Sequence, residues 1–327
     1  MKILYIGGTG EISHACVLES LQLGHEVAVY NRGQRAGVFP GKVEAIRGEL
    51  SDYSALRGRT FDVVCQFFAF DMAQIERDLK AFSGNAGQYV FISTASAYCK
   101  PMNRYTVVTE QTPLTNPYWE YSQKKRQMEL KLLEWHAAGK LPATIVRPSH
   151  TYRLNFPTAL GKGDWTARRM LDGKPVIVHG DGSSLWTLTH ASDFARPFAR
   201  LLGNKKALGE DFHITRDQPY TWDEIFHAMA AALGAEPKLV HVASETLIRY
   251  EPKWIGPLLG DKSPSTVFDN AKVKSVAGDF DCTVSLEAGM QAAAAAYLQR
   301  SKSGATLEAE VDVALYERII LEQQGLH

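Results

Sequence analysis

The sequence predicts an α/β fold, a doubly wound parallel sheet followed by a smaller C-terminal α/β domain that binds substrate. Two observations predict it: short apolar segments alternate with helical segments over the first 150 residues, and a glycine-rich turn separates the first strand from the first helix. Because the 327 residues exceed one usual core, we expect two domains, residues 1–150 and 151–327. Residues 186–205 are expected to return to the first domain.

The first domain is predicted element by element from hydrophobic periodicity. Predicted strands cover residues 2–6, 26–30, 43–46, 61–67, 88–93 and 143–147, and predicted helices cover 11–23, 51–56, 71–82 and 118–138. After Pro148 the alternation becomes uneven. There the pattern predicts a strand and helix within 188–202 and helices at 222–233, 285–298 and 308–323.

Composition and charge exclude several classes of function. The chain is 45% apolar and has 36 basic and 36 acidic side chains, so no overall field attracts a nucleic acid. It has no apolar run of the length that spans a membrane, and its N-terminus lacks the pattern of a signal peptide, so we expect a cytoplasmic protein. Its four cysteines and ten histidines show no metal-ligand spacing, and we predict no metal.

The glycine-rich turn begins at residue 7, directly after the first predicted strand. In that position such a turn predicts binding of a dinucleotide, and the fold is then of the Rossmann type. Gly7 permits the tight turn, and Gly10 lets the backbone approach the pyrophosphate at the positive end of the following helix. Ser13 replaces the third glycine that usually allows close helix packing. The turn's predicted cofactor-binding residues are Gly7, Thr9, Gly10, Glu11 and Ile12.

The end of the second predicted strand decides which dinucleotide is expected. Many such folds place an acid there to bind the adenosine ribose, whereas this chain has Asn31 and Arg32. A guanidinium pairs with a 2′-phosphate, so NADP is favoured over NAD, and Arg35 is in reach to assist. Residues expected around the adenine are Glu49, Leu50, Phe68 and Ala69.

A tyrosine and a lysine, Tyr121 and Lys125, lie four residues apart on one face of a predicted helix. An ammonium beside a phenol favours the phenolate, which lets the tyrosine exchange a proton with a substrate oxygen near neutral pH. The hydroxyl-rich segment 93–98 precedes this helix, at the end of the fifth predicted strand, where active sites of such folds collect.

These motifs, with Arg147-Pro148, Tyr152 and the pair Asp269 and Lys272, occur in an order that resembles extended short-chain dehydrogenases/reductases of the NAD-dependent epimerase/dehydratase group. The resemblance implies that Thr94 binds the reacting oxygen, with Ser93 and Ser96 as alternatives. It implies that Tyr121 is the acid/base and Lys125 its electrostatic partner, and that both, with Pro148, contact the cofactor. It also implies a homodimer joined through the two long helices of the first domain.

Two departures from the family pattern restrict the reaction and the substrate. Ala95 and Ser96 stand where sugar-nucleotide dehydratases of the family have an Asp-Glu pair, which argues against dehydration by that route. After the turn 180–182, Trp186 occurs near the position of an arginine that grips a nucleotide diphosphate in many members. Trp186 can stack on a sugar or base but cannot neutralise a diphosphate. Basic side chains that could do so are Arg168, Arg169 and Lys262.

The expected function is reversible hydride transfer at a secondary alcohol or ketone of a sugar or sugar-nucleotide, giving epimerisation or net reduction. The expected substrate-binding residues are Ser93, Ser96, Trp186 and Lys262. One alternative is a small ketone or aldehyde reductase. The other alternative is a non-catalytic dinucleotide-binding regulatory or RNA-binding protein. It is included because the sequence after the turn 180–182 is similar to that of an atypical branch of the family, which resembles chloroplast stem-loop RNA-binding proteins.

Overall fold

The computed structural model describes residues 1–33, 39–102, 107–303 and 308–325. Its larger part is built on a seven-stranded sheet in which all neighbouring strands run parallel. The strands are β1 Lys2–Ile6, β2 Glu26–Asn31, β3 Val43–Arg47, β4 Phe61–Gln66, β5 Ala86–Ile92, β6 Ala143–Pro148 and β11 Asp211–Ile214. They lie in the order β11-β6-β5-β4-β1-β2-β3, so the direction of winding reverses beside β1, where folds of this kind bind ligands.

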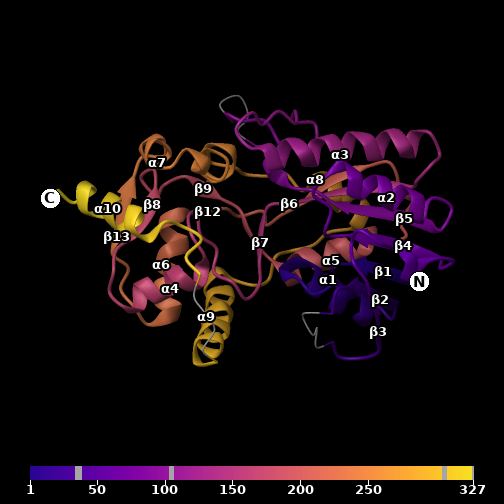
Figure 1. Ribbon diagram of the computed structural model, residues 1–327, viewed down its shortest axis with the longest axis horizontal. Helices are drawn as coiled ribbons and strands as arrows, with labels where there is room; N and C mark the ends of the chain where they lie inside the picture. The colour runs from indigo at the N-terminus through magenta and orange to yellow at the C-terminus, as the bar shows by residue number, and fades with distance from the viewer. Residues whose placement is uncertain (34–38, 103–106, 304–307, 326–327) are drawn as a thin grey trace.

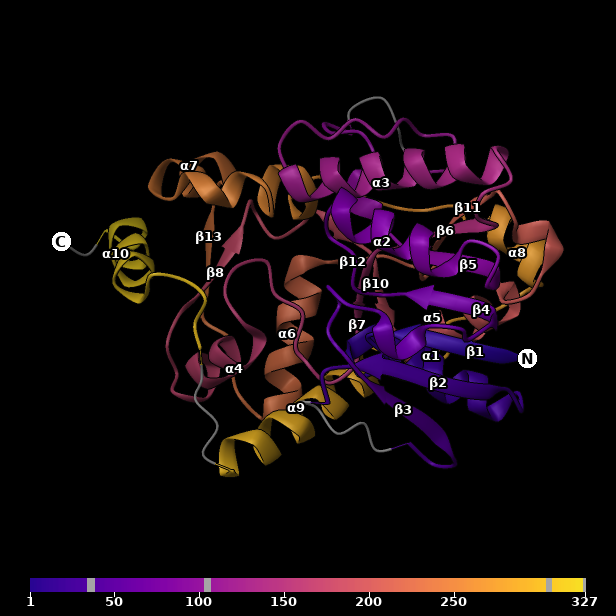
Figure 2. The same ribbon diagram turned by 45° about the vertical axis from the view of Figure 1, so that its right-hand side comes forward.

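Helices cover both faces of this sheet (Figures 1 and 2). Alternate side chains of β1 point to opposite faces: Ile3 and Tyr5 belong to one core cluster, Leu4 and Ile6 to another. The first face is covered by α1 Glu11–Gln22, α5 Ala191–Leu201 and α8 Ala271–Ala277, and the second by α2 Met72–Phe82 and α3 Glu120–Ala137. The predicted doubly wound parallel sheet is confirmed.

A smaller α/β part lies at the other end of the molecule, on the left in Figure 1, around its own apolar core. It has short strands paired as β10-β7, β12-β9 and β13-β8. The strands are β7 His150–Tyr152, β8 Val176–His179, β9 Leu185–Trp186, β10 Leu188–His190, β12 Tyr220–Thr221 and β13 Leu239–Val242. The helices are α4 Gly163–Leu171, α6 Trp222–Leu233, α7 Ser244–Tyr250, α9 Leu286–Lys302 and α10 Val313–Gln323.

The chain passes between the two parts more than once. Helix α5, within the segment 186–205 that is expected to return, packs on α1, and its Phe194 and Phe198 are fully buried. Strand β11 and helix α8, later in the chain, also belong to the larger part. The division into domains at residue 150 stays a prediction.

Local side-chain chemistry explains where the elements begin. Helix α2 starts after Asp71, whose carboxylate accepts the N–H of Gln74 at 2.9 Å, so the helix expected from residue 71 begins one residue later. The helix predicted over 51–56 is wrong. Only a single 3-10 turn forms at Ser54–Leu56, because Asp52 bonds both the N–H and the hydroxyl of Ser54, at 2.8 Å each, and so competes with a longer helix.

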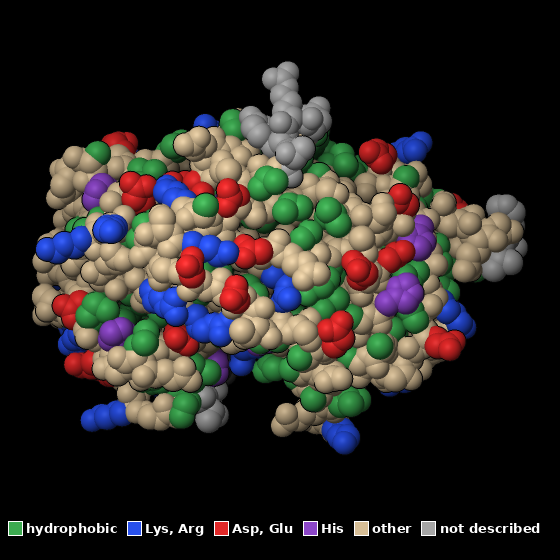
Figure 3. Space-filling model, turned by 180° about the vertical axis from the view of Figure 1, so that it is seen from behind, with side chains coloured by type: hydrophobic (Ala, Val, Ile, Leu, Met, Phe, Trp, Pro, Cys, Tyr) green, Lys and Arg blue, Asp and Glu red, His purple; other side chains and the backbone are tan. Residues whose placement is uncertain are grey.

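The surface mixes charges of both signs. On the face seen in Figure 3, the described Lys and Arg side chains lie among Asp and Glu side chains, and no broad area of one sign covers it. Among the described residues, no helix has the length and apolar character needed to cross a bilayer.

Candidate active site

A cavity of about 1040 Å³ lies at the carboxyl ends of the parallel strands, where the two parts of the molecule meet. The larger part contributes the glycine turn after β1, the ends of β2 and β6, and the segment after β5. The smaller part contributes side chains that include Trp186 and Lys262. The chain therefore brings the predicted dinucleotide turn, the hydroxyl segment and the tyrosine-lysine pair to one continuous space.

The glycine turn has a backbone that only glycine adopts without strain. Gly7 has a φ of +106° and Gly8 a φ of +29°, and a Cβ at Gly8 would lie 2.5 Å from a methyl carbon of Val29. Gly10 precedes α1 and has no side chain that could cap the helix, so the N–H groups of the first helical residues, from Glu11 on, are available to an anion. Ser13 is buried, and its hydroxyl accepts the N–H of Gly10 at 2.9 Å. The turn thus fits the pyrophosphate of a dinucleotide.

Most predicted cofactor-binding residues line the cavity. Two do not: Glu49 is exposed, with its carbonyl accepting the Tyr30 hydroxyl at 3.0 Å, and Ala69 is fully buried. Those that line it are Gly7, Thr9, Gly10, Glu11, Ile12, Asn31, Arg32, Leu50, Phe68, Tyr121, Lys125 and Pro148.

The end of β2 presents an exposed guanidinium to the cavity. Arg32 lines it, and the Asn31 side chain accepts the N–H of Gly33 at 2.7 Å, which fixes the turn that carries Arg32. A Cβ at Gly33 would lie 2.9 Å from Nε of Arg47, so a second guanidinium lies close to this turn. Arg35 lies outside the described residues.

Lys125 is almost fully buried in α3, and its ammonium is held by backbone. Its Nζ donates to the carbonyl oxygens of Ala69 and Ile92, both at 2.8 Å, and lies 5.8 Å from the centre of the Tyr121 ring. Burial lowers the pKa of Lys125 to about 7, while the carboxylate of Glu129, one helical turn away, opposes that shift. Ala69 therefore acts on the site through its carbonyl group.

Tyr121 lines the cavity beside a chain of hydroxyl groups. Burial raises the pKa of Tyr121 to about 12, with a further rise from Asp261, and a hydrogen bond with Thr94 opposes both. The Thr94 and Ser96 hydroxyls lie 2.9 Å apart, and Ser96 and Ser122 lie 2.7 Å apart. Of the three candidate hydroxyls, Thr94 is the one that lowers the pKa of Tyr121.

Ser93 also lines the cavity, at the end of β5. Its hydroxyl is buried and has no hydrogen-bond partner among the described residues. A buried hydroxyl without a partner is costly, so Ser93 has an unused hydrogen-bonding capacity beside this site.

Trp186 lines the cavity mainly as a support for His150. It is 5% exposed and stacks on Trp222, and its indole N–H donates to Nδ1 of His150 at 3.2 Å. Burial, and then the charge of Lys262, lower the pKa of His150 to about 3, so this imidazole is neutral. With Nδ1 accepting, the proton sits on Nε2. His150 thus offers an N–H donor in a cavity wall.

Lys262, predicted to bind substrate, lines the same region. Its Nζ lies 3.2 Å from a carboxylate oxygen of Asp261 and 5.7 Å from the centre of the Trp119 ring. Arg168 and Arg169 do not line the cavity: Arg168 pairs with Asp172 and Arg169 with Glu317.

Sequence reasoning missed many of the lining residues, and Lys100, His150 and Asp261 are among them. His150 follows the Arg147-Pro148 pair, so the rule that active sites collect at strand ends could have found it. Lys100 lies in an irregular segment and Asp261 in the short π-helix Leu258–Lys262, and neither position carries a periodic or motif signal.

Glu11 connects the glycine turn to the smaller part of the molecule. One of its carboxylate oxygens accepts the successive N–H groups of Arg153, Leu154 and Asn155 at 3.1, 2.9 and 3.2 Å. The Glu11 carboxylate, at the start of α1, is therefore bound by three backbone N–H groups of the loop after β7. These hydrogen bonds fix that loop against the dinucleotide turn.

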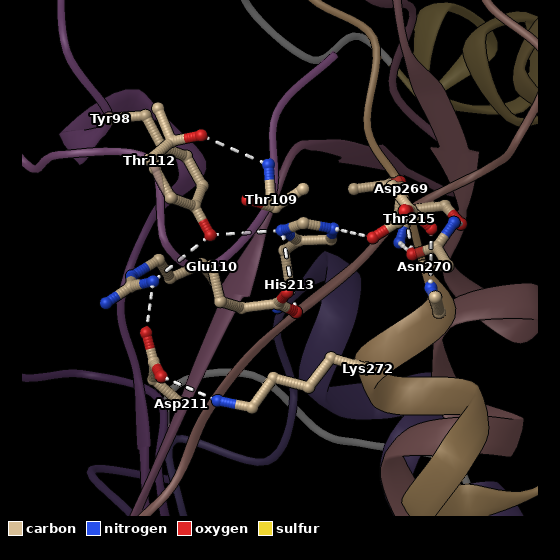
Figure 4. Close-up of polar contacts among 12 residues, drawn as sticks. Tyr98, Thr109, Glu110, Thr112, Asp211, His213, Thr215, Asp269, Asn270 and Lys272 are labelled. Atoms are coloured by element: carbon tan, nitrogen blue, oxygen red, sulfur yellow. Dashed lines mark hydrogen bonds and ion pairs between the residues drawn. The ribbon is translucent and has the colours of Figure 1, made fainter.

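A buried polar network joins the segment after β5 to β11 and to the start of α8 (Figure 4). His213 bonds the Tyr98 hydroxyl at 3.0 Å and the Asp269 carbonyl at 2.8 Å, and burial lowers the pKa of His213 to about 4. Lys272 donates to Asp211 at 2.9 Å. Asp269 and Lys272, which the family resemblance singled out, thus serve packing between β11 and α8.

The part of the chain that the structure describes contains no group of three or more His, Cys, Asp or Glu side chains placed to hold a metal ion. The four cysteines are free thiols, and Cys16, Cys65 and Cys99 are buried.

The buried ammonium of Lys125 predicts a pH-dependent stability. An unfolded lysine stays protonated up to about pH 10.4, whereas folded Lys125 loses its proton near pH 7. Between these values the unfolded state binds more protons, so stability rises with pH. The unfolding free energy of wild type, relative to a Lys125→Met variant, should increase by up to about 1.4 kcal/mol per pH unit above pH 7. Urea unfolding of both proteins at pH 6, 7.5 and 9 measures it, and a difference that is constant across these pH values contradicts the assignment.

The comparisons with known proteins agree with this geometry. Residues 73–215 match the NAD dependent epimerase/dehydratase family. The UDP-glucose 4-epimerase of Lactobacillus helveticus is 30% identical over 313 residues, which cover 85% of this chain and 91% of that protein. The chain belongs to the NAD-dependent epimerase/dehydratase family. It is an enzyme of that family, as the fold and the tyrosine-lysine pair predict.

Two other relatives of this chain have names that indicate different functions. The 2'-dehydrokanamycin reductase of Streptomyces kanamyceticus is 29% identical, covering 75% of this chain and 70% of that protein. The chloroplast stem-loop binding protein of 41 kDa b of Arabidopsis thaliana is 27% identical, covering 73% of this chain and 65% of that protein.

Solved structures share the fold. The UDP-glucuronic acid 4-epimerase of Bacillus cereus in complex with NAD superposes with a TM-score of 0.71 at 19% identity, covering 91% of this chain and 99% of that one.

Proposed function

We propose that this chain transfers hydride reversibly at a secondary alcohol or ketone of a sugar or sugar-nucleotide, with NADP as the preferred dinucleotide. One observation carries the proposal: the glycine turn, Thr94, Tyr121 and Lys125 line one cavity. When bound, the nicotinamide supplies or accepts the hydride. Gly7 and Gly10 hold the pyrophosphate at the start of α1.

The residues of the chain move the proton. Thr94 holds the reacting oxygen, and Tyr121 donates a proton to that oxygen during reduction or takes it during oxidation. The burial that raises the pKa of Tyr121 is opposed by the Thr94 hydrogen bond, and a protonated Lys125 5.8 Å from the ring favours the phenolate. Ala95 and Ser96 are buried and offer no acid for dehydration, which supports epimerisation or reduction instead.

The test mixes the purified protein with NADPH and a panel of sugar ketones, and separately with NADP⁺ and UDP-sugars, and follows nicotinamide absorbance and the configuration of the sugar. A steady loss of absorbance identifies a reductase. Sugar inversion without net loss identifies an epimerase. If no member of the panel gives either a loss of absorbance or an inverted sugar, the proposal is contradicted.

Preference for NADP is proposed from Arg32, an exposed guanidinium in the cavity wall with no carboxylate beside it at Asn31. Charge-assisted bonds to a phosphate contribute about 1.5–3 kcal/mol. Arg32→Ala should therefore weaken NADPH binding by about 10- to 100-fold and change NADH binding by less than about 3-fold. Titration calorimetry with both dinucleotides measures this.

The matched control is Arg59→Ala, because Arg59 already pairs with Glu44 at 2.6 Å and lies outside the cavity wall. It should leave both affinities unchanged. Equal losses for NADPH and NADH in Arg32→Ala would show that Arg32 does not contact a 2′-phosphate.

A second candidate is a non-catalytic dinucleotide-binding or RNA-binding protein, which the similarity to the chloroplast stem-loop binding protein favours. Against it stand the intact Tyr121 and Lys125 and the mixed charges of the face in Figure 3, which provide no continuous positive track for a nucleic acid. A small ketone or aldehyde reductase is a third candidate, and the sugar panel separates it from the first. A homodimer joined through the two long helices of the first domain, and a cytoplasmic location, stay predictions.

A further inference from the structure

Lys100 is a buried cation in the wall of the substrate region. It is 5% exposed and lines the cavity, and its backbone N–H donates to the carbonyl of Thr115 at 2.9 Å, which fixes its place after the hydroxyl segment. Its side-chain ammonium has no hydrogen bond or ion pair with any residue that the structure describes. Lys100 therefore differs from Lys125, whose ammonium is held by two carbonyl groups.

The charges around Lys100 do not balance. Asp261 is the acid that acts on it, but a carboxylate oxygen of Asp261 already lies 3.2 Å from Nζ of Lys262. His150, in the same wall, is neutral because burial and Lys262 lower its pKa to about 3. This region thus contains two ammonium groups against one carboxylate, a surplus of one positive charge.

A buried ammonium without a partner is costly, and burial lowers the pKa of Lys100 accordingly. Removing such an unpaired charge removes its desolvation cost. A lysine kept in the wall of a cavity, with its charge uncompensated, indicates that a ligand supplies the opposite charge.

We propose that Lys100 binds an anionic group of the substrate, a carboxylate or a phosphate, so that the substrate is an acidic sugar derivative. The inference rests on the proposed function, because it names the substrate class of that site. Lys100 and Tyr121 line the same cavity, so one bound substrate can present its anionic group to Lys100 and its reacting carbon to Tyr121. The His150 N–H is a further neutral donor for it.

The test measures binding rather than turnover, using the protein with and without saturating NADP⁺. Trp119 and Trp186 line the cavity, so tryptophan fluorescence reports occupancy. Three matched pairs of probes are titrated: glucuronate against glucose, glucose 1-phosphate against methyl glucoside, and UDP against uridine. The first pair tests a carboxylate on the sugar, the second a phosphate on the sugar, and the third a nucleotide diphosphate.

In wild type, the acidic member of at least one pair should bind at least about 10-fold more tightly than its neutral partner. Lys100→Met should weaken the acidic probe by about 10- to 100-fold and the neutral probe by less than about 3-fold. Lys253→Met is the control, because the Lys253 side chain is 79% exposed, and it should leave every affinity unchanged. The melting temperature of Lys100→Met should equal or exceed that of wild type. If that variant is poorly folded, Lys100→Gln must show the same selective loss.

Equal binding of acidic and neutral probes by wild type, or an acid preference that survives in Lys100→Met and Lys100→Gln, overturns the inference. The two proposals fail separately. Selective binding of acidic probes without any turnover of NADPH retains the inference and contradicts hydride transfer. Turnover that depends on Tyr121, without selective binding of acidic probes, supports hydride transfer and contradicts the inference about Lys100.

Discussion

Tyr121→Phe is expected to lower kcat by about 10²- to 10⁴-fold, the range that a positioned general acid or base contributes. The phenyl ring fills the same space beside Lys125 and Trp119, so the fold and the cavity should be retained. The variant loses only the hydroxyl that is proposed to exchange the proton. Initial rates at saturating substrate and dinucleotide measure the effect, and the affinity for NADPH should change far less than kcat.

Tyr118→Phe is the matched control. Tyr118 is half-buried, lies three residues earlier and is not part of the cavity wall, so its kcat should stay within about 2-fold of wild type. An unchanged kcat in Tyr121→Phe would show that proton transfer occurs at another group, and the mechanism proposed above would be wrong.

Arg147→Met is expected to destabilise the fold by about 3–5 kcal/mol, because it leaves a buried carboxylate without its partner. Arg147 and Glu129 are 2% and 1% exposed and are joined by contacts of 2.6, 3.0 and 3.1 Å. Arg147 also binds Asp211 at 2.6 Å and the Tyr98 hydroxyl at 3.1 Å, so it ties α3 to β11 and to the segment after β5. Urea unfolding at pH 7 measures the loss.

The double variant Glu129→Gln, Arg147→Met removes both charges and should be more stable than Arg147→Met alone. Arg59→Met breaks the partly exposed pair with Glu44 and should cost less than about 1 kcal/mol. If Arg147→Met costs no more than Arg59→Met, the buried pair does not hold these elements together.

Local signals in the sequence were sufficient for most of the larger part. Strand β1 begins and ends where the apolar run predicts, and Gly7, with its φ of +106°, makes the expected turn. The failure at residues 51–56 has a local cause, because Asp52 bonds Ser54 and ends the segment as a turn. The return of β11 to the sheet depends on pairing with β6, about 65 residues earlier, which no local pattern encodes.

The candidate site was predictable where motifs carry it. Thr94, Tyr121 and Lys125 come from a spacing and a segment that belong together in the family. Their surroundings were not predictable: the role of Trp186 depends on Trp222 and His150, and the charge balance at Lys100 depends on Asp261, 161 positions later. Such contacts follow from tertiary packing and leave no periodic signal in the sequence.

Isotope transfer tests hydride transfer at this site most directly. NADPH carrying deuterium at C4 of the nicotinamide is incubated with the protein and a panel of sugar ketones and UDP-keto-sugars, because only a carbonyl carbon accepts the deuteride, and the sugars are analysed by mass spectrometry. We predict that wild type moves one deuterium to a sugar carbon and that Tyr121→Phe moves almost none. Deuterium that stays on the dinucleotide with every sugar of the panel, while calorimetry shows that NADPH is bound, would contradict the account.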